Sequence, residues 1–427
     1  METVVAMAHA MGRTLVMPPS QHMYLLNKGN REHNFFSFAD FYHLEDLASE
    51  LLGITIISME EFLKRTAMQG LLVNRTTGVV SYPPENRTDW NGRRLHEKEL
   101  WEYLRDVTDV KNWKPDQCVF AFPSSPGKET EAHEVSQLQT ILNSNYKSYH
   151  KDPTKAVPVN APVKDRLTEI ASGRKKLCVY DSNMQESLVV HFMCYWKQRA
   201  RLLTHFYTFL FFENYQHDLW TKRFVRDHLR YVDSLQCAAA RIVHAIREKV
   251  KADDDKNNNP EGIFDSFHVR RGDFQYKETR VEASELLRTC KDEIPEGSAI
   301  YVATDERNKD FFKPLAERYR LFYLDDFKDL ITDVNPNHYG MLDQLIASKG
   351  RVFFGTYHST FTGYIDRMRG YHVEKNKEEG YEDGLMLNSY FFLKLFKNKK
   401  RTFASPRTTF SREFPIAWRD IDYGVNS

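Results

Sequence analysis

The chain has 427 residues, a length that fits two or three domains better than one small core. Hydrophobic residues make up 41% and charged residues 28%, with a mean hydropathy of −0.59, which excludes wholesale disorder and a membrane bundle. With 60 Lys and Arg against 59 Asp and Glu, the net charge is +1, so no overall field attracts nucleic acid. We predict a globular protein that has no nucleic-acid partner.

In the first half, apolar periodicity and turn residues predict alternating helices and strands. Gly12 is expected to end the first helix. Polar residues dominate after residue 73, so residues 73–160 are expected to form a polar insertion. The expected helices cover residues 3–11, 44–52, 60–64, 201–212 and 232–250, and the expected strands cover residues 13–17, 54–57, 118–122 and 176–180.

No membrane segment is expected in the chain. The longest apolar stretch, residues 202–212, contains Thr204 and His205 and is shorter than the roughly 20 residues that a membrane helix needs. The first residues lack the basic and apolar regions of a signal peptide.

Cysteines and sequons bear on the cellular compartment. The 5 cysteines show no CxxC spacing, which disfavours a zinc site or a dithiol motif, and their odd number leaves at least one thiol free. Asn74-Arg75-Thr76 and Asn86-Arg87-Thr88 are N-glycosylation sequons in a polar stretch. Sequons also arise by chance, but these two favour a secretory lumen.

After a polar run over residues 252–260, the second half alternates regularly between strands and helices. Such alternation predicts a parallel sheet, whose ligands bind at the carboxyl ends of the strands. The expected strands cover residues 264–269, 299–303, 321–324 and 352–354, and the expected helices cover residues 281–287, 308–318, 339–347 and 364–368.

The densest group of candidate functional residues is His268-Val269-Arg270-Arg271-Gly272-Asp273-Phe274, where an expected strand ends. Two arginines beside a glycine suit a diphosphate, because guanidinium groups bind phosphate oxygens and glycine lets the backbone come close. A solvated, arginine-rich surface turn explains the same residues about as well.

Two further groups lie near the ends of neighbouring strands. Ser359 and Thr360 offer hydroxyls and backbone N–H groups at a helix start, which suits an anion, although N-capping alone also explains them. Asp305 and Asp343 offer carboxylates, and a carboxylate here can accept hydrogen bonds from guanine. Capping or a salt bridge is the alternative for each.

Together these groups resemble the GDP-fucose protein O-fucosyltransferase superfamily. The resemblance spans residue 1 to about residue 371 and is specific in the second half, where six motifs keep the family's order. The amino-terminal residues 8–19 are also similar to the family's first domain. The six motifs are 268–274, Ala303-Thr304-Asp305, Asp343-Gln344 with Ser348, Phe354-Gly355-Thr356, Ser359-Thr360-Phe361 and Arg369-Gly370.

The resemblance implies an α/β, GT-B-like fold with two Rossmann-type domains facing a central cleft. These domains are expected over residues 1–230 and 231–375, followed by a tail over 376–427. The implied activity is inverting transfer of fucose from GDP-fucose to a hydroxyl of a protein Ser or Thr, or of a glycan. The reaction needs no cofactor and no obligatory metal, and the implied location is the lumen of the endoplasmic reticulum or Golgi.

The resemblance also assigns site residues. Arg270 matches the catalytic arginine that contacts the β-phosphate and stabilises departing GDP. His268 matches a position near the ribose and base, and Asp343 the position that recognises guanine. The residues implied to bind the donor are His268, Arg270, Arg271, Asp343, Ser359, Thr360 and Phe361. Asp273 and Asp305 are implied to brace the loop or touch the acceptor, and the same role is the alternative for Arg271.

One departure from the family concerns the start of the chain. Family members carry a first strand and a Gly- and Asn-rich turn before the helix that here begins near Thr3. We therefore expect a sequence truncated at its amino terminus, with uncertain activity. The alternatives to fucose transfer are transfer of a related deoxysugar such as rhamnose, and an inactive protein that binds a nucleotide sugar or acts as a scaffold.

Overall fold

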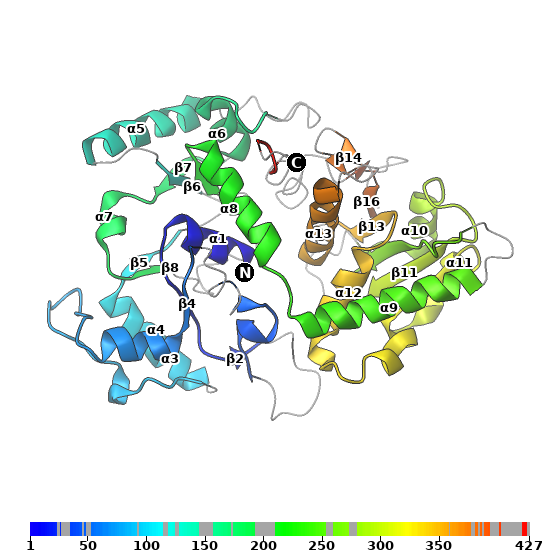
Figure 1. The fold of residues 1–427 in the computed structure, drawn as a ribbon, viewed down its shortest axis with the longest axis horizontal. Helices are drawn as coiled ribbons and strands as arrows, with labels where there is room; N and C mark the ends of the chain where they lie inside the picture. The colour runs from blue at the N-terminus through cyan, green and yellow to red at the C-terminus, as the bar shows by residue number, and fades with distance from the viewer. Residues whose placement is uncertain are drawn as a thin grey trace. The chain divides into compact units, whose positions relative to one another are not determined.

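The computed structural model describes residues 1–427 except 24–25, 27–34, 45–46, 48–52, 92–93, 114–117, 124–127, 145–156, 172–173, 193–209, 253–258, 273–279, 358, 377–380, 383–384, 387, 393–400, 403–420 and 425–427. The chain has a mixed α/β fold with parallel sheets and forms two compact units (Figure 1). The first unit comprises residues 1–151, 157–232 and 421–427, and the second comprises 152–156 and 233–420.

The first unit holds several short sheets with helices around them. Its strands pair in the orders β1-β4, β2-β3, β5-β8 and β7-β6-β9, and all but the β2-β3 pair are parallel. The strands are β1 Leu15–Met17, β2 Gln21–His22, β3 Phe35–Phe36, β4 Ile56–Ser58, β5 Asp109–Lys111, β6 Cys118–Phe122, β7 Lys176–Val179, β8 Val190–Phe192 and β9 Leu210–Phe212. The helices are α1 Glu2–Ala10, α3 Met59–Phe62 with a π-helical continuation Leu63–Ala67, α4 Arg94–Val107, α5 Lys128–Ser144, α6 Val163–Ala171, α7 Ser182–Glu186 and α8 Tyr215–His228.

The first helix and strand follow the sequence expectation. Gly12 adopts a φ of +61°, a left-handed conformation that favours glycine, and the chain then enters β1. An apolar cavity of about 770 Å³ is lined by α1, β1 and β8. Arg13 at its edge donates from Nη2 to the carbonyls of Met184 and Gln185, each at 2.8 Å.

Residues 73–160 differ from the expected polar insertion. Helix α4 carries Leu100, Tyr103 and Val107 at helical spacing, and these side chains pack into one core with Phe62. Further along, β6 is the central strand of its sheet and is fully buried. Because this stretch contains many charged residues, its overall composition is polar, although its apolar side chains pack in the core of the first unit.

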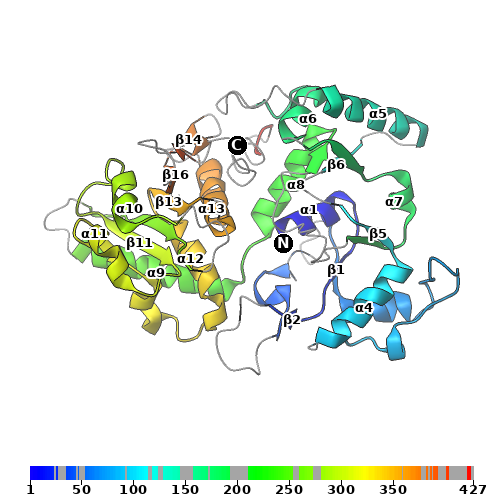
Figure 2. The same cartoon turned by 180° about the vertical axis from the view of Figure 1, so that it is seen from behind.

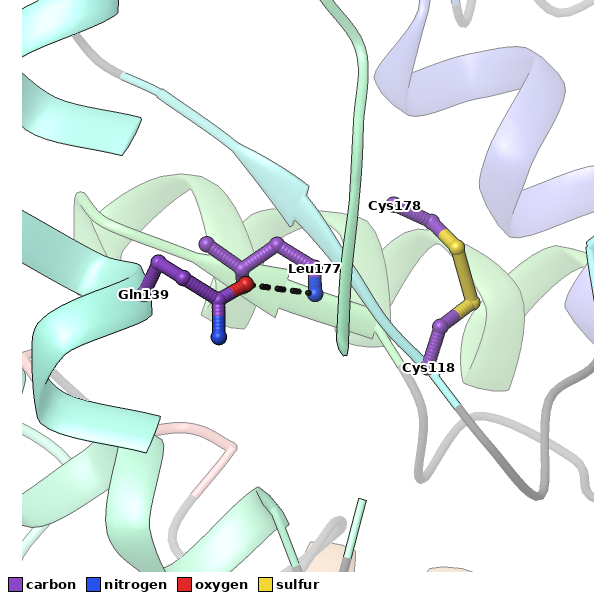
Figure 3. Close-up of a disulfide and its surroundings, with 4 residues drawn as sticks. All are labelled: Cys118, Gln139, Leu177 and Cys178. Carbon is purple, nitrogen blue, oxygen red and sulfur yellow. Dashed lines mark hydrogen bonds between the residues drawn. A yellow bond between two sulfur atoms is a disulfide. The ribbon is translucent and has the colours of Figure 1, made fainter. Parts of the chain in front are cut away.

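A disulfide joins two strands of the first unit. Cys118 of β6 and Cys178 of β7 are bonded, with their Cα atoms 5.8 Å apart (Figure 3). Beside them, Gln139 of α5 accepts a hydrogen bond from the backbone N–H of Leu177 at 3.4 Å. Cys237 and Cys290 are free, and Cys194 lies outside the described residues.

The second unit is built on one six-stranded sheet. Its strand order is β12-β11-β10-β13-β16-β17, parallel throughout except for the last pair. The strands are β10 Asp265–Val269, β11 Ala299–Thr304, β12 Arg320–Phe322, β13 Phe353–Thr356, β14 Tyr381–Glu382, β15 Leu385–Met386, β16 Ser389–Phe392 and β17 Arg401–Thr402. The helices are α9 Asp233–Ala252, α10 Ala283–Cys290, α11 Lys313–Ala316, α12 Tyr339–Ala347 and α13 Thr360–Asn376, with 3-10 turns at Lys309–Phe312, Leu324–Leu330 and Pro336–His338.

Helices cover both faces of this sheet. On one face, Phe267 and Val302 pack against Leu286 of α10 and Leu315 of α11. On the other, the Ser266 hydroxyl donates to the carbonyl of Ala347 at the end of α12, which itself packs on α9. Helix α9 accordingly lies in front of the sheet in Figure 1 and behind it in Figure 2.

Most expected strands and helices of the second unit are present. Strands form at 265–269, 299–304, 320–322 and 353–356, and α12 has the predicted bounds. The expected tail over 376–427 is different, because β16 pairs with β13 and so extends the sheet. Residues 421–427 belong to the first unit, where Arg226 binds Asp422 at 2.7 Å.

The helix expected over residues 201–212 is wrong at its end. Leu210, Phe211 and Phe212 form strand β9, which pairs with β6 from Phe120 to Phe122. A short apolar run buried on both faces suits a parallel strand as well as a helix, so its spacing was ambiguous. Residues 201–209, and most of the helix expected over 44–52, lie outside the described part of the chain. No described helix combines the length and the apolar character needed to cross a membrane.

Candidate functional site

The candidate site lies at the carboxyl ends of β10 and β13. The chain runs outward from β10 to β11 and β12 and then returns to β13 on the other side of β10. In open α/β sheets, ligands bind outside the carboxyl ends of the strands where the strand order reverses in this way. The expected site residues after β10 and β13 therefore lie at the position where this topology places a ligand.

Asp305 holds together the turn that follows β10. Its Oδ1 accepts the backbone N–H of Arg271 at 2.7 Å, and its Oδ2 accepts that of Gly272 at 2.8 Å. Oδ2 also lies 2.8 Å from Nη1 of Arg270, so one carboxylate fixes both the turn and the guanidinium. A Cβ at residue 272 would collide with Oδ2, so any other residue there would displace the Asp305 carboxylate from these contacts. These contacts fit the bracing role expected of Asp305.

Arg270 is ordered but remains accessible. A third of its side chain, 33%, is exposed to solvent. Its backbone N–H donates to the Thr356 hydroxyl at 2.9 Å, and that hydroxyl donates to the carbonyl of His268 at 3.1 Å. The ends of β10 and β13 are thus tied together through Thr356, a buried residue of the motif Phe354-Gly355-Thr356 that had not been assigned a role of its own.

Arg271 is directed into contacts within the chain. Its Nε donates to Glu306 at 3.1 Å, its Nη1 donates to the carbonyl of Val281 at 3.1 Å, and its guanidinium stacks 3.8 Å from the ring centre of Phe311. These contacts fit the bracing alternative better than a direct contact with the donor. Asp273, the other expected bracing residue, lies outside the described residues.

His268 is buried and neutral. Its Nδ1 is hydrogen-bonded to the Thr362 hydroxyl at 2.6 Å, and its ring stacks on Phe361 with the ring centres 4.5 Å apart. Burial, together with the charge of Arg270, lowers the pKa of His268 to about 3. At neutral pH the imidazole therefore acts as a hydrogen-bonding group without charge.

Ser359 and Thr360 lie at the start of α13, a helix of 17 residues whose first residue is Thr360. The carbonyl of Ser359 accepts the N–H of Gly363 at 3.0 Å, so Ser359 occupies the position just before the helix. Ser359 is buried and Thr360 is exposed. The start of a helix carries partial positive charge and unsatisfied N–H groups, which favour an anion.

Asp343 is held on α12 by Tyr301. The Tyr301 hydroxyl donates to Oδ1 of Asp343 at 2.6 Å. Burial, reinforced by Asp343, raises the pKa of Tyr301 well above its usual value, so the hydroxyl keeps its proton. Gly340 lies in the first turn of α12, and a Cβ at that residue would be 3.7 Å from the ring of Phe361. Asp343 therefore has a fixed orientation on the face of the sheet that α12 covers.

A sequence model of the GDP-fucose protein O-fucosyltransferase family matches residues 1–372. The chain belongs to this family. It is a glycosyltransferase, and the family's reaction is transfer of fucose from GDP-fucose to a protein acceptor. No curated protein sequence matches the chain significantly.

Among solved structures, the chain is similar to POFUT1. For its complex with GDP-fucose the identity is 12% and the TM-score 0.33, over 91% of this chain and 92% of that one. For a complex with GDP the identity is 13% and the TM-score 0.35, over 92% and 93%. A further complex with GDP gives 12% and 0.34, over 92% of each chain.

The fold brings several of the expected O-fucosyltransferase residues together. His268, Phe361, Arg270 and Asp305 are linked by stacking or hydrogen bonds within one edge of the sheet. Three residues that position them were not among the expected site residues: Tyr301, Thr356 and Thr362. Thr356 lies inside a motif and ends β13, so a hydroxyl at the end of a strand was an available signal for it, whereas Tyr301 lies within β11 and Thr362 in α13. No three described His, Cys, Asp or Glu side chains gather as a metal site.

Proposed function

We propose that this chain transfers fucose from GDP-fucose to a Ser or Thr hydroxyl of a protein, with the donor diphosphate bound between Arg270 and the start of α13. The observation that supports it most is the Arg270 guanidinium, held 2.8 Å from Asp305 where the strand order reverses. Arginine offers several donors in a rigid, permanently charged group, which suits the diphosphate oxygens.

The proposed chemistry places Arg270 on the leaving group. The bond from fucose C1 to the β-phosphate oxygen breaks, and its electron pair stays on that oxygen as GDP departs. The acceptor hydroxyl oxygen forms the new bond to C1 from the opposite face and releases its proton, which inverts the configuration at C1. Arg270 and the N–H groups and hydroxyls of Ser359 and Thr360 stabilise the charge that grows on the diphosphate.

The nucleoside is proposed to lie along β10 and α12. His268 would hydrogen-bond the ribose or base as a neutral imidazole, and Phe361, stacked on it, would line the same pocket. Asp343, fixed by Tyr301, would accept hydrogen bonds from guanine. Arg271 would brace the loop through Glu306 and Val281.

Thr362 is expected to position His268 for the nucleotide. Thr362→Val keeps the shape of the side chain but leaves Nδ1 of the buried His268 without its partner. The hydrogen bond that holds the imidazole in its orientation is then lost, which costs about 1–2 kcal/mol. We expect the GDP dissociation constant to rise by about 5–30-fold and Thr362→Ser to restore it. Isothermal titration calorimetry measures both.

The matched control is Thr289→Val on α10, which removes a buried hydroxyl that, among the described residues, is bonded only to its own helix, at the Glu285 carbonyl. It should leave the dissociation constant for GDP unchanged. A folded Thr362→Val chain with unchanged affinity would show that Thr362 does not position His268.

We further propose a GT-B architecture, two Rossmann-type domains facing a central cleft, and a location in the lumen of the endoplasmic reticulum or Golgi. The reversed strand order of the second unit supports the first proposal. The Cys118–Cys178 disulfide supports the second, because disulfides persist in oxidising compartments (Figure 3).

Calorimetric titration with GDP, UDP and ADP, each with and without a chelator, tests the donor site. We expect selective binding of GDP, unchanged by the chelator, because Arg270 and helix-start donors supply the positive charge that a metal would otherwise provide. A preference for UDP would point to a rhamnose-type donor. Absence of GDP binding by the folded chain would refute the proposed function.

A further inference from the structure

A hairpin in the first unit exposes an unusual amount of apolar surface. Val73 and Val80 form an antiparallel bridge around a short turn. Five of the eleven large hydrophobic side chains that are exposed in the described part of the chain lie in residues 71–82, which contain this hairpin. They form what we call the hairpin patch: Leu71 (56% exposed), Val73 (43%), Val79 (64%), Val80 (42%) and Tyr82 (49%).

The hairpin is anchored firmly to the unit beneath it. Leu72, between two patch residues, is buried in the core with Trp90. The backbone N–H of Arg75 donates to the Asp106 carbonyl at 2.9 Å, and the Tyr103 hydroxyl donates to the Ser81 carbonyl at 2.9 Å. The hairpin patch is therefore a fixed outward surface. An apolar surface of this kind is a liability unless something covers it.

The turn of this hairpin is a sequon. The Oδ1 atom of Asn74 accepts the backbone N–H groups of Thr76 and Thr77, each at 3.0 Å, which fixes the carboxamide. Its Nδ2 makes no hydrogen bond to any described residue. The carboxamide that would carry a sugar is thus fixed at the start of the turn, where the backbone N–H of Asn74 donates to the carbonyl of Val79 at 2.8 Å.

A second sequon follows at Asn86. Its side chain is exposed, and its φ of +52° belongs to a turn after Pro84. Asn and Asp tolerate this conformation better than other residues with a side chain. Both sequons therefore lie at the surface, with Asn86 exposed and Asn74 partly exposed.

We propose that Asn74 and Asn86 carry N-linked glycans and that the glycan on Asn74 covers the hairpin patch. The modification rests on the proposed lumenal location. The donor is a lipid-diphosphate-linked oligosaccharide. The bond from the sugar C1 to a phosphate oxygen breaks and leaves its electrons on the lipid diphosphate, while Nδ2 forms a bond to C1 and loses one proton. The attached glycan is bulky and hydrated, so it shields the apolar side chains beside it.

The test is secretion of the full chain behind a cleavable signal peptide from a eukaryotic host, followed by intact-mass measurement. We expect the mass of two glycans, both removed by peptide N-glycosidase. Asn74→Gln and Asn86→Gln should each lose the mass of one glycan, and Thr76→Ala should lose the same glycan as Asn74→Gln. Thr76→Ser, which keeps the sequon, and Thr77→Ala, which lies outside it, should retain both glycans.

Shielding of the hairpin patch by the glycan is tested separately, by dye binding and aggregation. Asn74→Gln should bind more of a hydrophobic dye and aggregate faster than the glycosylated chain, and adding Val79→Asp should reverse both effects. Secreted chain with an unmodified mass would overturn the glycan assignment, and equal dye binding with and without the glycan would overturn the shielding. GDP titration of the same sample keeps these outcomes apart from the proposed transferase function.

Discussion

Replacing Arg270 by alanine is expected to lower kcat for GDP release from GDP-fucose by about 10²–10³, the range found when a preorganised donor to developing charge is removed. As the C1–O bond breaks, negative charge grows on the β-phosphate oxygen, and a fixed guanidinium stabilises this transition state more than the ground state. The Arg270–Asp305 ion pair at 2.8 Å keeps the guanidinium in place before the donor binds. Initial rates of GDP release measure the effect, with water as the acceptor until a protein acceptor is identified.

Arg241→Ala provides a matched control. Arg241 also pairs with a carboxylate, Asp333, at 2.7 Å, but this pair is exposed at the surface of the second unit. We expect kcat to change by less than about twofold, because exposed ion pairs contribute little. Arg270→Lys keeps the charge and loses the planar fork, so its rate should fall between those of the unmodified chain and the alanine variant. An Arg270→Ala chain with an unchanged kcat would remove Arg270 from the mechanism.

The meeting of the candidate residues at one edge of the sheet was predictable, because it follows from local patterns. Phe267 and Val269 in Asp265–Val269, and the two phenylalanines in Phe353–Thr356, indicate interior strands, and polar residues follow each run. Parallel strands bring their carboxyl ends to one edge, so residues nearly ninety positions apart can be placed together from the sequence. The contact between Thr356 and the backbone of Arg270 agrees with that reasoning.

The contacts that fix each site residue were not predictable. His268 and Thr362 are separated by 94 residues, and their hydrogen bond depends on how α13 packs against β10. The sequence likewise could not show that Asp305 binds two backbone N–H groups and a guanidinium at once. The contribution of β16 to the sheet was missed, because a run as short as Ser389–Phe392 does not by itself indicate that it pairs with β13. Such contacts depend on tertiary packing, which residue spacing does not encode.

Removing the Cys118–Cys178 disulfide is expected to lower the free energy of unfolding of the first unit by about 4 kcal/mol. The cysteines are 60 residues apart, so the bond closes a long loop and reduces the entropy of the unfolded chain. Denaturant unfolding of a Cys118→Ser, Cys178→Ser double variant tests this. Tryptophan fluorescence follows the first unit, because five of the 6 tryptophans of the chain lie before Val232, in the residues of that unit.

The control for this experiment is Cys237→Ser, which replaces an exposed free thiol on α9 and should leave the unfolding midpoint unchanged. GDP affinity provides a second comparison. All the proposed donor contacts come from the second unit, whereas the disulfide joins β6 and β7 of the first. The double variant should therefore bind GDP as the unmodified chain does under conditions where both are folded. Equal unfolding curves for the double variant and the unmodified chain would mean that the cross-link does not stabilise the first unit.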